Sequence, residues 1–343
     1  MKAVRLFGAD DLRVVDAPIP EIGSGEILVR VGAALICGTD VRMLKNGSKV
    51  SPVTLGHEFA GSVEAVGRDV RGYKAGMRVA VAPNYGCGVC DQCVSGQGQN
   101  CGILRALGIH DDGGFAEYVR VPAPAVAHGN VAPIDDGVGF AEAAIAEPLS
   151  CVYNSFERVH FKPGESVIVI GAGPVGLLHA KLYKLAGAGL VMMSDINPDR
   201  LRTCVRDEPS FVPVPAEEAK ERTLELTRGA GADVVIAAAS VPSVQQLSFG
   251  LAALNGRVVF FGGLPAGKEV VGLDTNVIHY KQITVTGTSR QSLSQYRACL
   301  GLISRGLIDV GSVITKTWRL DEAIAAFASA ARGEGLKSGF SMG

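Results

Sequence analysis

The chain has 343 residues, of which 47% are hydrophobic and 20% charged, which is enough apolar material for about two packed domains and excludes a disordered chain. Lys and Arg number 33 against 34 Asp and Glu, and this net charge of −1 excludes the basic surface that nucleic acids require. Charges lie at Arg5, Asp10 and Asp11, and the longest charge-free run, 234–256, contains proline and glutamine. We therefore expect neither a signal peptide nor a membrane-spanning helix, and a cytoplasmic location.

The first 150 residues predict a β-rich unit. Short Val-rich segments bounded by Gly and Pro lie at 27–33, 61–67, 78–83 and 116–122. No long helical period separates these segments. The pattern favours a barrel-like or sandwich-like unit whose loops carry the function.

Four of the eight cysteines crowd into one glycine-rich stretch, and the predicted ligands are Cys87, Cys90, Cys93 and Cys101. In a long chain without a secretion signal, such clustering favours a metal over disulfides. Four thiolates can enclose one Zn²⁺ tetrahedrally and leave no open position, which predicts a structural zinc. An iron–sulfur cluster is the alternative, but its signature ends in Cys-Pro, whereas Gly102 follows the last cysteine here.

From about residue 150 the chain alternates between predicted strands and helices. The strands are expected at 166–170, 190–195, 211–214, 233–239, 257–263 and 283–289, and an amphipathic helix is expected at 217–229. Near-continuous apolar strands separated by helices are typical of a parallel sheet covered on both faces. The tail, with helical stretches near 292–305 and 321–332, is too short for a third domain and should pack on one of the other two.

A GxGxxG motif follows the strand at 166–170 and opens a helix; its predicted cofactor-binding residues are Gly171, Gly173, Pro174, Val175 and Gly176. Its glycines permit a tight turn, the approach of a pyrophosphate and close helix packing. Asp195 ends the next strand, where its carboxylate can accept hydrogen bonds from ribose hydroxyls and would repel a 2′-phosphate. NAD is therefore favoured over NADP. Arg200 either stacks on the adenine or is a solvated helix charge.

Three separated segments carry the residue types of one open metal site: Cys37 in ICGTD, His57-Glu58 in LGHEFAG and Glu147 in AEPLS. Thiolate, imidazole and carboxylate ligands with one water let zinc polarise a bound oxygen. Each segment alone is a weak signal, because a single Cys or His more often packs than ligates. Alternation along an extended chain also argues against His57 and Glu58 ligating together.

Together these motifs, in this order, resemble the zinc-dependent medium-chain alcohol dehydrogenase family along essentially the whole chain. Glu147 and the segment 276–296 resemble its sorbitol (L-iditol 2-dehydrogenase) branch. The resemblance implies an α/β fold with a GroES-like catalytic domain at 1–148, carrying the zinc lobe 87–101, and a Rossmann domain at 149–288. Residues 289–343 would return to the catalytic domain. It also implies two Zn²⁺ per chain, NAD, and a homodimer or homotetramer.

The resemblance further implies that Cys37, His57 and either Glu58 or Glu147 surround a catalytic zinc. The hydroxyl of Thr39 would pass the alcohol proton towards the cofactor ribose and solvent. The nicotinamide end of the cofactor would be bordered by Gly263, Leu264, Ser289 and Arg290.

One position departs from the relatives that act on threonine or sorbitol. They commonly have a histidine three residues after the relay hydroxyl, whereas this chain has Arg42. A relay ending in imidazole is therefore not available there. Arg42 either meets an anionic substrate group, for example a phosphate, or lies exposed without a partner. Asp40 would orient the neighbours of the metal, or be an ordinary turn residue.

The implied reaction is the NAD-linked, zinc-dependent oxidation of a secondary alcohol of a polyol or sugar to the ketone. L-threonine 3-dehydrogenase-like oxidation of an amino alcohol, and oxidation of a polyol phosphate or aminocyclitol, are the alternatives. A zinc-free quinone or enoyl reductase would need neither set of metal ligands, and a non-catalytic binding protein would not retain them all. The expected partner is thus a small-molecule polyol, sugar or amino alcohol, with no nucleic acid and no membrane.

Overall fold

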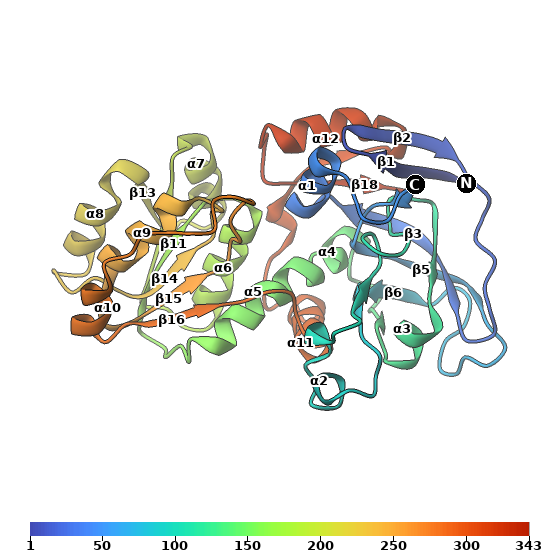
Figure 1. The fold of residues 1–343 in the computed structure, drawn as a ribbon, viewed down its shortest axis with the longest axis horizontal. Helices are drawn as coiled ribbons and strands as arrows, with labels where there is room; N and C mark the ends of the chain where they lie inside the picture. The colour runs from blue at the N-terminus through green and yellow to red at the C-terminus, as the bar shows by residue number, and fades with distance from the viewer. Residues whose placement is uncertain (343) are drawn as a thin grey trace. The chain divides into compact units, whose positions relative to one another are not determined.

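The computed structural model describes residues 1–342, and Figure 1 labels many of its helices and strands. The chain forms two compact units: the first comprises Met1–Ser150 with the chain from Gln291 onward, and the second comprises Cys151–Arg290. The tail therefore packs with the N-terminal half. Within residues 1–342, no helix combines the length and the apolar character that crossing a bilayer requires.

Antiparallel strands dominate the first unit, as its Val-rich segments predict. A three-stranded sheet has the order β2 (Asp11–Asp16), β1 (Lys2–Gly8), β4 (Val53–Thr54). A seven-stranded sheet has the order β10 (Val131–Pro133), β6 (Arg78–Val81), β5 (Glu58–Val66), β3 (Ile27–Leu35), β18 (Lys337–Ser341), β17 (Ile314–Trp318), with β9 (Tyr118–Val121) also paired to β3. The pair β7 (Asn84–Tyr85) and β8 (Arg105–Ala106) flanks the cysteine-rich loop.

The helices of the first unit are short and stand between these strands. They are α1 (Gly38–Asn46), α2 (Asp91–Val94), α3 (Ala123–Ala127), α4 (Phe140–Ala144), α5 (Ala146–Arg158, which continues into the second unit), α11 (Leu293–Ser304) and α12 (Ala323–Ala331), with 3₁₀ turns η1 (Gly98–Asn100), η3 (Gly311–Val313) and η4 (Leu320–Glu322). Because α1 follows β3 directly, and β5 pairs with β3, the segments that carry Cys37 and His57 are neighbours.

The C-terminal segment is built into the core of the first unit. Strand β18 pairs antiparallel with β3, and Gly339 lies opposite Leu35. The ring of Phe340 on β18 packs edge-on against Phe115 at a centroid separation of 5.0 Å, and Phe327 on α12 packs against the same ring at 5.8 Å. Burial of these aromatic side chains fixes the position of the last strand, and therefore of Lys337 at its start.

The second unit is a doubly wound parallel sheet, as predicted. Its strand order is β13 (Val212–Pro215), β12 (Leu190–Asp195), β11 (Ser166–Ile170), β14 (Ala232–Ala237), β15 (Ala252–Phe260), β16 (Thr284–Gly287). The helices are α6 (Pro174–Leu185), α7 (Pro198–Asp207), α8 (Ala219–Leu226), α9 (Pro242–Leu251) and α10 (Thr275–Lys281), with the 3₁₀ turn η2 (Ala216–Glu218).

Both faces of this sheet are covered. On strand β11, Ile168 and Ile170 belong to one buried apolar cluster, whereas Val167 and Val169 belong to another. Successive strand residues point to opposite faces, so the two clusters are the two interfaces between sheet and helices. This arrangement explains the nearly continuous apolar run SVIVI, and it confirms the α/β fold class.

Some element boundaries differ from the sequence-based prediction. The helix expected at 217–229 is α8, Ala219–Leu226, preceded by η2 and ended before Arg228 and Gly229, which both have positive φ. The strand expected at 257–263 begins earlier, at Ala252, and ends at Phe260. Such shifts arise at turns, where local backbone conformation outweighs the apolar pattern.

Candidate metal and cofactor sites

The four cysteines of the lobe converge. The sulfur atoms of Cys87, Cys90, Cys93 and Cys101 all lie within 4.8 Å of one another. The distance between the sulfurs of Cys87 and Cys93 is 4.0 Å, and that between the sulfurs of Cys90 and Cys101 is 3.8 Å. Sulfurs at the corners of a zinc tetrahedron with bonds of about 2.3 Å are about 3.8 Å apart, whereas a disulfide needs about 2.05 Å. The donor set therefore fits one Zn²⁺ and no disulfide.

Glycine shapes this lobe where the chain must pass close to sulfur. A Cβ atom on Gly86 would lie 2.6 Å from the Cys93 sulfur, so a larger residue would displace the ligand. Hydrogen bonds from the backbone N–H groups of Val89 and Cys90 lower the pKa of Cys87 to about 6. Burial raises the pKa of Cys93 to about 11, a cost that a bound cation would offset. The loop by itself thus favours the thiolate at Cys87, whereas a bound cation would be needed to favour it at Cys93.

A second cluster lies at the junction of three elements. One ligand atom each from Cys37, His57 and Glu58 lies within 4.8 Å of the other two. Cys37 is the N-cap residue of α1, His57 stands in the bend before β5, and Glu58 is the first residue of β5. Because His57 precedes the strand, the alternation that argued against joint ligation does not apply to it.

Asp40 lies against two members of this cluster, Cys37 and His57. Its carboxylate is fully buried and accepts a hydrogen bond of 2.8 Å from the backbone N–H of Cys37. The Nδ1 atom of His57 lies 3.4 Å from the other carboxylate oxygen, outside good hydrogen-bond geometry. Burial disfavours the charged imidazole, but Asp40 and Cys37 raise the pKa of His57 well above its usual value. A carboxylate beside a ligating imidazole commonly fixes the ring for the metal.

Lys337 approaches the same cluster from the last strand. Its Nζ lies 2.6 Å from Oε1 of Glu58, and both side chains are buried. Burial alone would lower the pKa of Lys337, but Glu58 and Cys37 raise it, so the ammonium is retained. Oε2 of Glu58 is buried without a hydrogen-bond partner. One oxygen of Glu58 is thus held by a cation of the protein, and the other is available to a metal.

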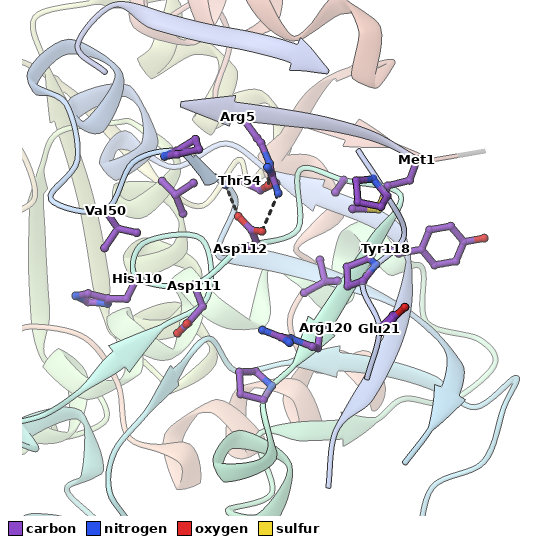
Figure 2. Close-up of a pocket in the computed structure, with 18 residues that line it drawn as sticks. Met1, Arg5, Glu21, Val50, Thr54, His110, Asp111, Asp112, Tyr118 and Arg120 are labelled. Carbon is purple, nitrogen blue, oxygen red and sulfur yellow. Dashed lines mark hydrogen bonds and ion pairs between the residues drawn. The ribbon is translucent and has the colours of Figure 1, made fainter. Parts of the chain in front are cut away.

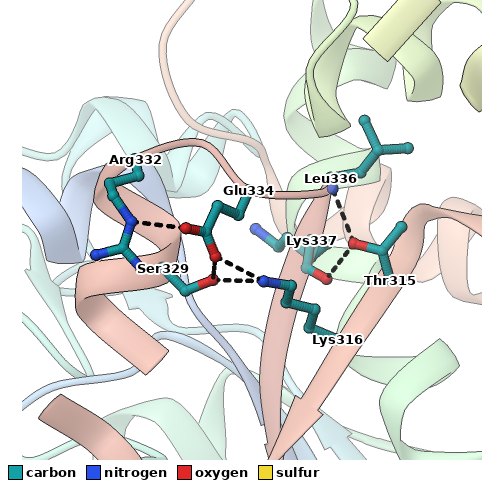
Figure 3. A network of polar contacts seen from close by, with 7 residues as sticks. All are labelled: Thr315, Lys316, Ser329, Arg332, Glu334, Leu336 and Lys337. Carbon is teal, nitrogen blue, oxygen red and sulfur yellow. Dashed lines mark hydrogen bonds and ion pairs between the residues drawn. The ribbon is translucent and has the colours of Figure 1, made fainter. Parts of the chain in front are cut away.

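A polar network holds the turn before Lys337 (Figure 3). The carboxylate of Glu334 accepts hydrogen bonds from Arg332 at 2.6 Å, and from Lys316 and Ser329 at 2.8 Å each. The backbone N–H of Leu336 donates to the hydroxyl of Thr315 at 2.8 Å. These contacts fasten both sides of the turn that leads into β18.

Glu147 lies in the first turn of α5, outside the group formed by Cys37, His57 and Glu58. Its side chain is buried, and its Oε1 accepts a hydrogen bond of 3.2 Å from Gln291. Burial raises the pKa of Glu147 to about 7, although His57 opposes the shift. Of the two candidate carboxylates, the structure therefore groups Glu58 with the cysteine and histidine. Glu147 lies close enough to His57 and Glu58 for both to influence its pKa.

The residues of this cluster fit Zn²⁺. The set combines one sulfur, one imidazole nitrogen and one carboxylate oxygen, which is the donor chemistry of open zinc sites. The fit also rests on the buried Oε2 of Glu58, which has no hydrogen-bond partner. A cation there would satisfy this oxygen and offset the buried negative charge of Asp40 and Glu58.

Thr39 and Arg42 lie on the first two turns of α1. The Nη2 atom of Arg42 donates a hydrogen bond of 2.9 Å to the hydroxyl oxygen of Thr39. Thr39 is half-buried, and Arg42 is exposed. Arg42 therefore contacts the hydroxyl that the family resemblance makes the proton relay.

A surface cavity of about 480 Å³ lies elsewhere in the first unit (Figure 2). Its lining includes Arg5, Thr54, His110 and Asp112, but neither Cys37 nor the other members of the metal cluster. Asp112 is held by Arg5 at 3.0 Å and by the backbone N–H of Thr54 at 2.7 Å. Arg5 and Asp112 thus form an ion pair within the lining of this cavity.

In the second unit, the glycine motif forms the turn between β11 and α6. Gly171 has a φ of +115°, and a Cβ atom on Gly176 would lie 1.8 Å from the Gly171 carbonyl oxygen. Gly173 has no atom within 4 Å of the place where its Cβ would stand, so its backbone is open to a ligand. Pro174 and Val175 begin α6, whose N-terminus favours phosphate. This turn fits a dinucleotide pyrophosphate.

Asp195 ends β12, beside the glycine turn. Its two carboxylate oxygens accept hydrogen bonds from the backbone N–H groups of Ala172, at 2.7 Å, and Asn197, at 2.8 Å. Each oxygen retains a further lone pair for a ribose hydroxyl. Asp195 therefore also fastens the glycine turn, a role that the sequence pattern did not indicate.

The other predicted cofactor residues follow the carboxyl ends of strands in this parallel sheet, or begin the next helix. Arg200 lies in the first turn of α7, where its backbone N–H donates a hydrogen bond to the side-chain oxygen of Asn197. Gly263 and Leu264 follow β15, and Ser289 and Arg290 follow β16. Ligands of open α/β sheets bind at this edge, where the strand order reverses between β11 and β14.

Comparison with known proteins assigns the family. The family model described as the alcohol dehydrogenase GroES-like domain matches residues 23–132, and that described as zinc-binding dehydrogenase matches residues 174–305. The chain belongs to the zinc-dependent medium-chain dehydrogenase family. It is thus an oxidoreductase of the zinc alcohol dehydrogenase type, which confirms the family, the fold class and the two cofactor types, zinc and a nicotinamide dinucleotide.

Individual relatives carry different names. L-threonine 3-dehydrogenase of Bacillus subtilis is 35% identical over 330 residues, covering 94% of this chain and 92% of the relative. Sorbitol dehydrogenase of the same species is 29% identical, covering 94% and 91%. The solved structure of a putative zinc-binding dehydrogenase from Sinorhizobium meliloti, bound to NADP, has a TM-score of 0.90 and 34% identity, covering 99% of this chain and 98% of that one.

Sequence reasoning missed two residues around the metal cluster. Lys337 contacts Glu58 across 279 positions of the chain, and Gln291 contacts Glu147 across 144. Gln291 also accepts a hydrogen bond of 3.3 Å from the Asn84 side chain. No clear signal for Lys337 was present in the sequence, because its strand reads KSGFS and has a single large apolar residue, Phe340.

Proposed function

We propose that this dehydrogenase oxidises a secondary alcohol of a polyol or sugar to the ketone, with transfer of hydride to NAD. The observation that carries the proposal is the grouping of Cys37, His57 and Glu58 within 4.8 Å, with Glu147 nearby as a second carboxylate. A cluster of this kind, separate from the closed four-cysteine lobe, gives a substrate oxygen access to the metal.

The residues of the first unit prepare the alcohol for reaction. A bound Zn²⁺ would supply Lewis-acid polarisation of the alcohol oxygen. Asp40 orients His57, and Lys337 balances the charge of Glu58. The hydroxyl of Thr39 accepts the alcohol proton and can pass its own proton to solvent or to a ribose hydroxyl.

The residues of the second unit bind and orient the dinucleotide. NAD supplies the hydride acceptor. The open backbone at Gly173 and the N-terminus of α6 receive the pyrophosphate. Asp195 receives the adenosine ribose, and its negative charge supports NAD over NADP. Gly263, Leu264, Ser289 and Arg290 are proposed to border the nicotinamide.

Asp195→Ala tests the cofactor preference. We expect kcat/KM with NAD to fall about tenfold more than kcat/KM with NADP, because only the NAD ribose has the 2′-hydroxyl that the carboxylate can bind. The substitution also frees the N–H of Ala172. Equal losses with both cofactors would therefore show that Asp195 only stabilises the glycine turn and does not bind the ribose.

Oxidation of an L-threonine-like amino alcohol is the second candidate. It is favoured by the 35% identity to an L-threonine 3-dehydrogenase over 94% of this chain. Polyols remain our first proposal because Glu147 in EPLS and the segment 276–296 resemble the sorbitol branch of the family.

A metal count combined with a substrate panel tests the proposed function. We expect two zinc ions per chain, and NAD reduction with at least one of sorbitol, xylitol, L-threonine or a hexitol phosphate. Removal of the zinc by a chelator should abolish turnover, and added Zn²⁺ should restore it. Undiminished turnover in a zinc-free preparation would overturn the proposal.

A further inference from the structure

Arg42 is an exposed cation beside the proposed relay hydroxyl. Its Nη2 lies 2.9 Å from the hydroxyl oxygen of Thr39, which stands two residues after the cluster member Cys37. A guanidinium has five N–H donors, and this contact uses one of them. The contact therefore leaves four donors for a substrate group bound near that hydroxyl.

Among the side chains that the structure describes, those of residues 1–342 except Asp207, no carboxylate pairs with this guanidinium. Arg42 takes part in none of their ion pairs, whereas Arg105 and Arg257, for example, each lie against an acidic side chain. The nearest acidic residue in the sequence, Asp40, is fully buried and holds the backbone of Cys37. Arg42 therefore places a positive charge, without an acidic partner among these side chains, on α1, one turn after Thr39.

The contact with Thr39 limits how far the Arg42 guanidinium can be from the substrate hydroxyl that reacts. A substrate hydroxyl that bonds to the Thr39 oxygen lies about 2.8 Å from it. The Arg42 nitrogen, 2.9 Å from the same oxygen, is then at most about 5.7 Å from the substrate hydroxyl. That span matches an anionic group on a carbon adjacent to the carbinol carbon, or one carbon further away.

We propose that Arg42 is a specificity-determining residue that binds a carboxylate or phosphate close to the carbinol carbon of the substrate. The inference rests on the proposed function and narrows its substrate class to anionic alcohols: polyol acids or polyol phosphates and, for the second candidate, hydroxy amino acids. Arginine suits this role because its planar fork binds both anions in a bidentate manner and stays charged at every physiological pH.

Matched substrate pairs test the proposal, with D-sorbitol against its 1-phosphate for the phosphate and L-threonine against its amide for the carboxylate. In the wild-type enzyme we expect kcat/KM for the anionic member of at least one pair to exceed that for the neutral member by at least about tenfold. Arg42→Ala should reduce that ratio to about one, mainly through KM, and Arg42→Lys should retain part of it. Lys45→Ala, which removes another exposed cation of α1, should leave the ratio unchanged.

Two outcomes overturn the proposal. A wild-type preference for the neutral member of both pairs would remove the anionic subsite. An equal loss for charged and neutral substrates in Arg42→Ala, carried by kcat, would show that Arg42 acts only by positioning Thr39.

A measurement without turnover separates failure of this inference from failure of the proposed function. Iodoacetate and iodoacetamide both alkylate a thiolate with loss of iodide, but only iodoacetate carries a carboxylate. In the zinc-loaded protein, the rate ratio of iodoacetate to iodoacetamide at Cys37, followed by peptide mass spectrometry, should fall at least about fivefold in Arg42→Ala and stay constant in Lys45→Ala. An unchanged ratio in Arg42→Ala counts against the subsite even if no alcohol is oxidised.

Discussion

The two metal clusters of the first unit are built in opposite ways. The ligands of the cysteine lobe come from residues 87–101, on a glycine-rich loop with exposed side chains such as Val89, 82% exposed. The cluster of Cys37, His57 and Glu58 joins separate segments and is enclosed by buried charges. A local loop can surround an ion by itself, whereas the second cluster exists only once the sheet and its last strand have formed.

This difference has consequences for charge. The lobe has four cysteine sulfurs around one position and no other kind of ligand. The second cluster balances Asp40 and Glu58 against Lys337, with Glu147 close enough for Glu58 to influence its pKa. A closed shell of like ligands stabilises structure, and an asymmetric set with a spare carboxylate can change its ligands.

Loss of the open cluster should have the largest effect on activity. We expect His57→Ala to lower kcat/KM by about three orders of magnitude, because a metal supplies several kcal/mol of charge stabilisation and each 1.36 kcal/mol is tenfold in rate. The zinc content should fall from two ions per chain to one, measured by atomic emission. His279→Ala, on α10 of the second unit, is the control and should keep both ions. Full activity of His57→Ala would show that the cluster takes no part in the reaction.

Loss of the lobe should act on stability instead. Cys93→Ser removes one of four ligands, and we expect the thermal midpoint to fall by at least about 4–8 °C, the shift that about 2 kcal/mol produces in a unit of this size. The remaining folded enzyme should keep its substrate preference and its catalytic zinc. A stable Cys93→Ser variant with altered substrate preference would break the contrast between a structural and a reactive cluster.

The buried ion pair between Lys337 and Glu58 has no equivalent in the cysteine lobe. Lys337→Met leaves the buried carboxylate of Glu58 without its cation, which we expect to cost about 3–5 kcal/mol of folding stability. It should also weaken the catalytic zinc or lower kcat/KM by about 10–100-fold. The double variant Lys337→Met with Glu58→Gln should recover most of the stability, since no unpaired charge remains. If the double variant is no more stable than Lys337→Met, the unpaired charge of Glu58 is not the cause of the lost stability.

The same contrast explains what the sequence could predict. The lobe was predictable because its four ligands lie within one short stretch with metal-like spacing, and the glycine turn because strand, motif and helix are contiguous. The contact of Lys337 with Glu58 joins residues 279 positions apart, and no local period or spacing encodes it. The strand-alternation argument does not apply to His57, because β5 begins only at Glu58, and joint ligation by the two residues stays a prediction.

The smallest effect is expected at Glu334, which holds the turn before Lys337 rather than the cluster itself. Hydrogen bonds from Arg332, then Lys316 and Ser329, lower the pKa of Glu334 to about 2. Because the folded-state pKa is lowered, the contribution to stability is complete above the ordinary value near 4.5 and is lost as the pH falls towards 2.

Glu334→Gln should therefore lower the thermal midpoint at pH 7 modestly, and the difference from the wild type should shrink as the pH falls below 4.5 towards 2. Glu217→Gln, an exposed glutamate on η2 of the second unit, is the matched control and should show no such trend. Because metal binding also weakens in acid, the difference between variant and wild type is the relevant quantity. A constant difference from pH 7 to pH 3 would assign the effect of Glu334 to packing, and the turn would then hold Lys337 without help from this carboxylate.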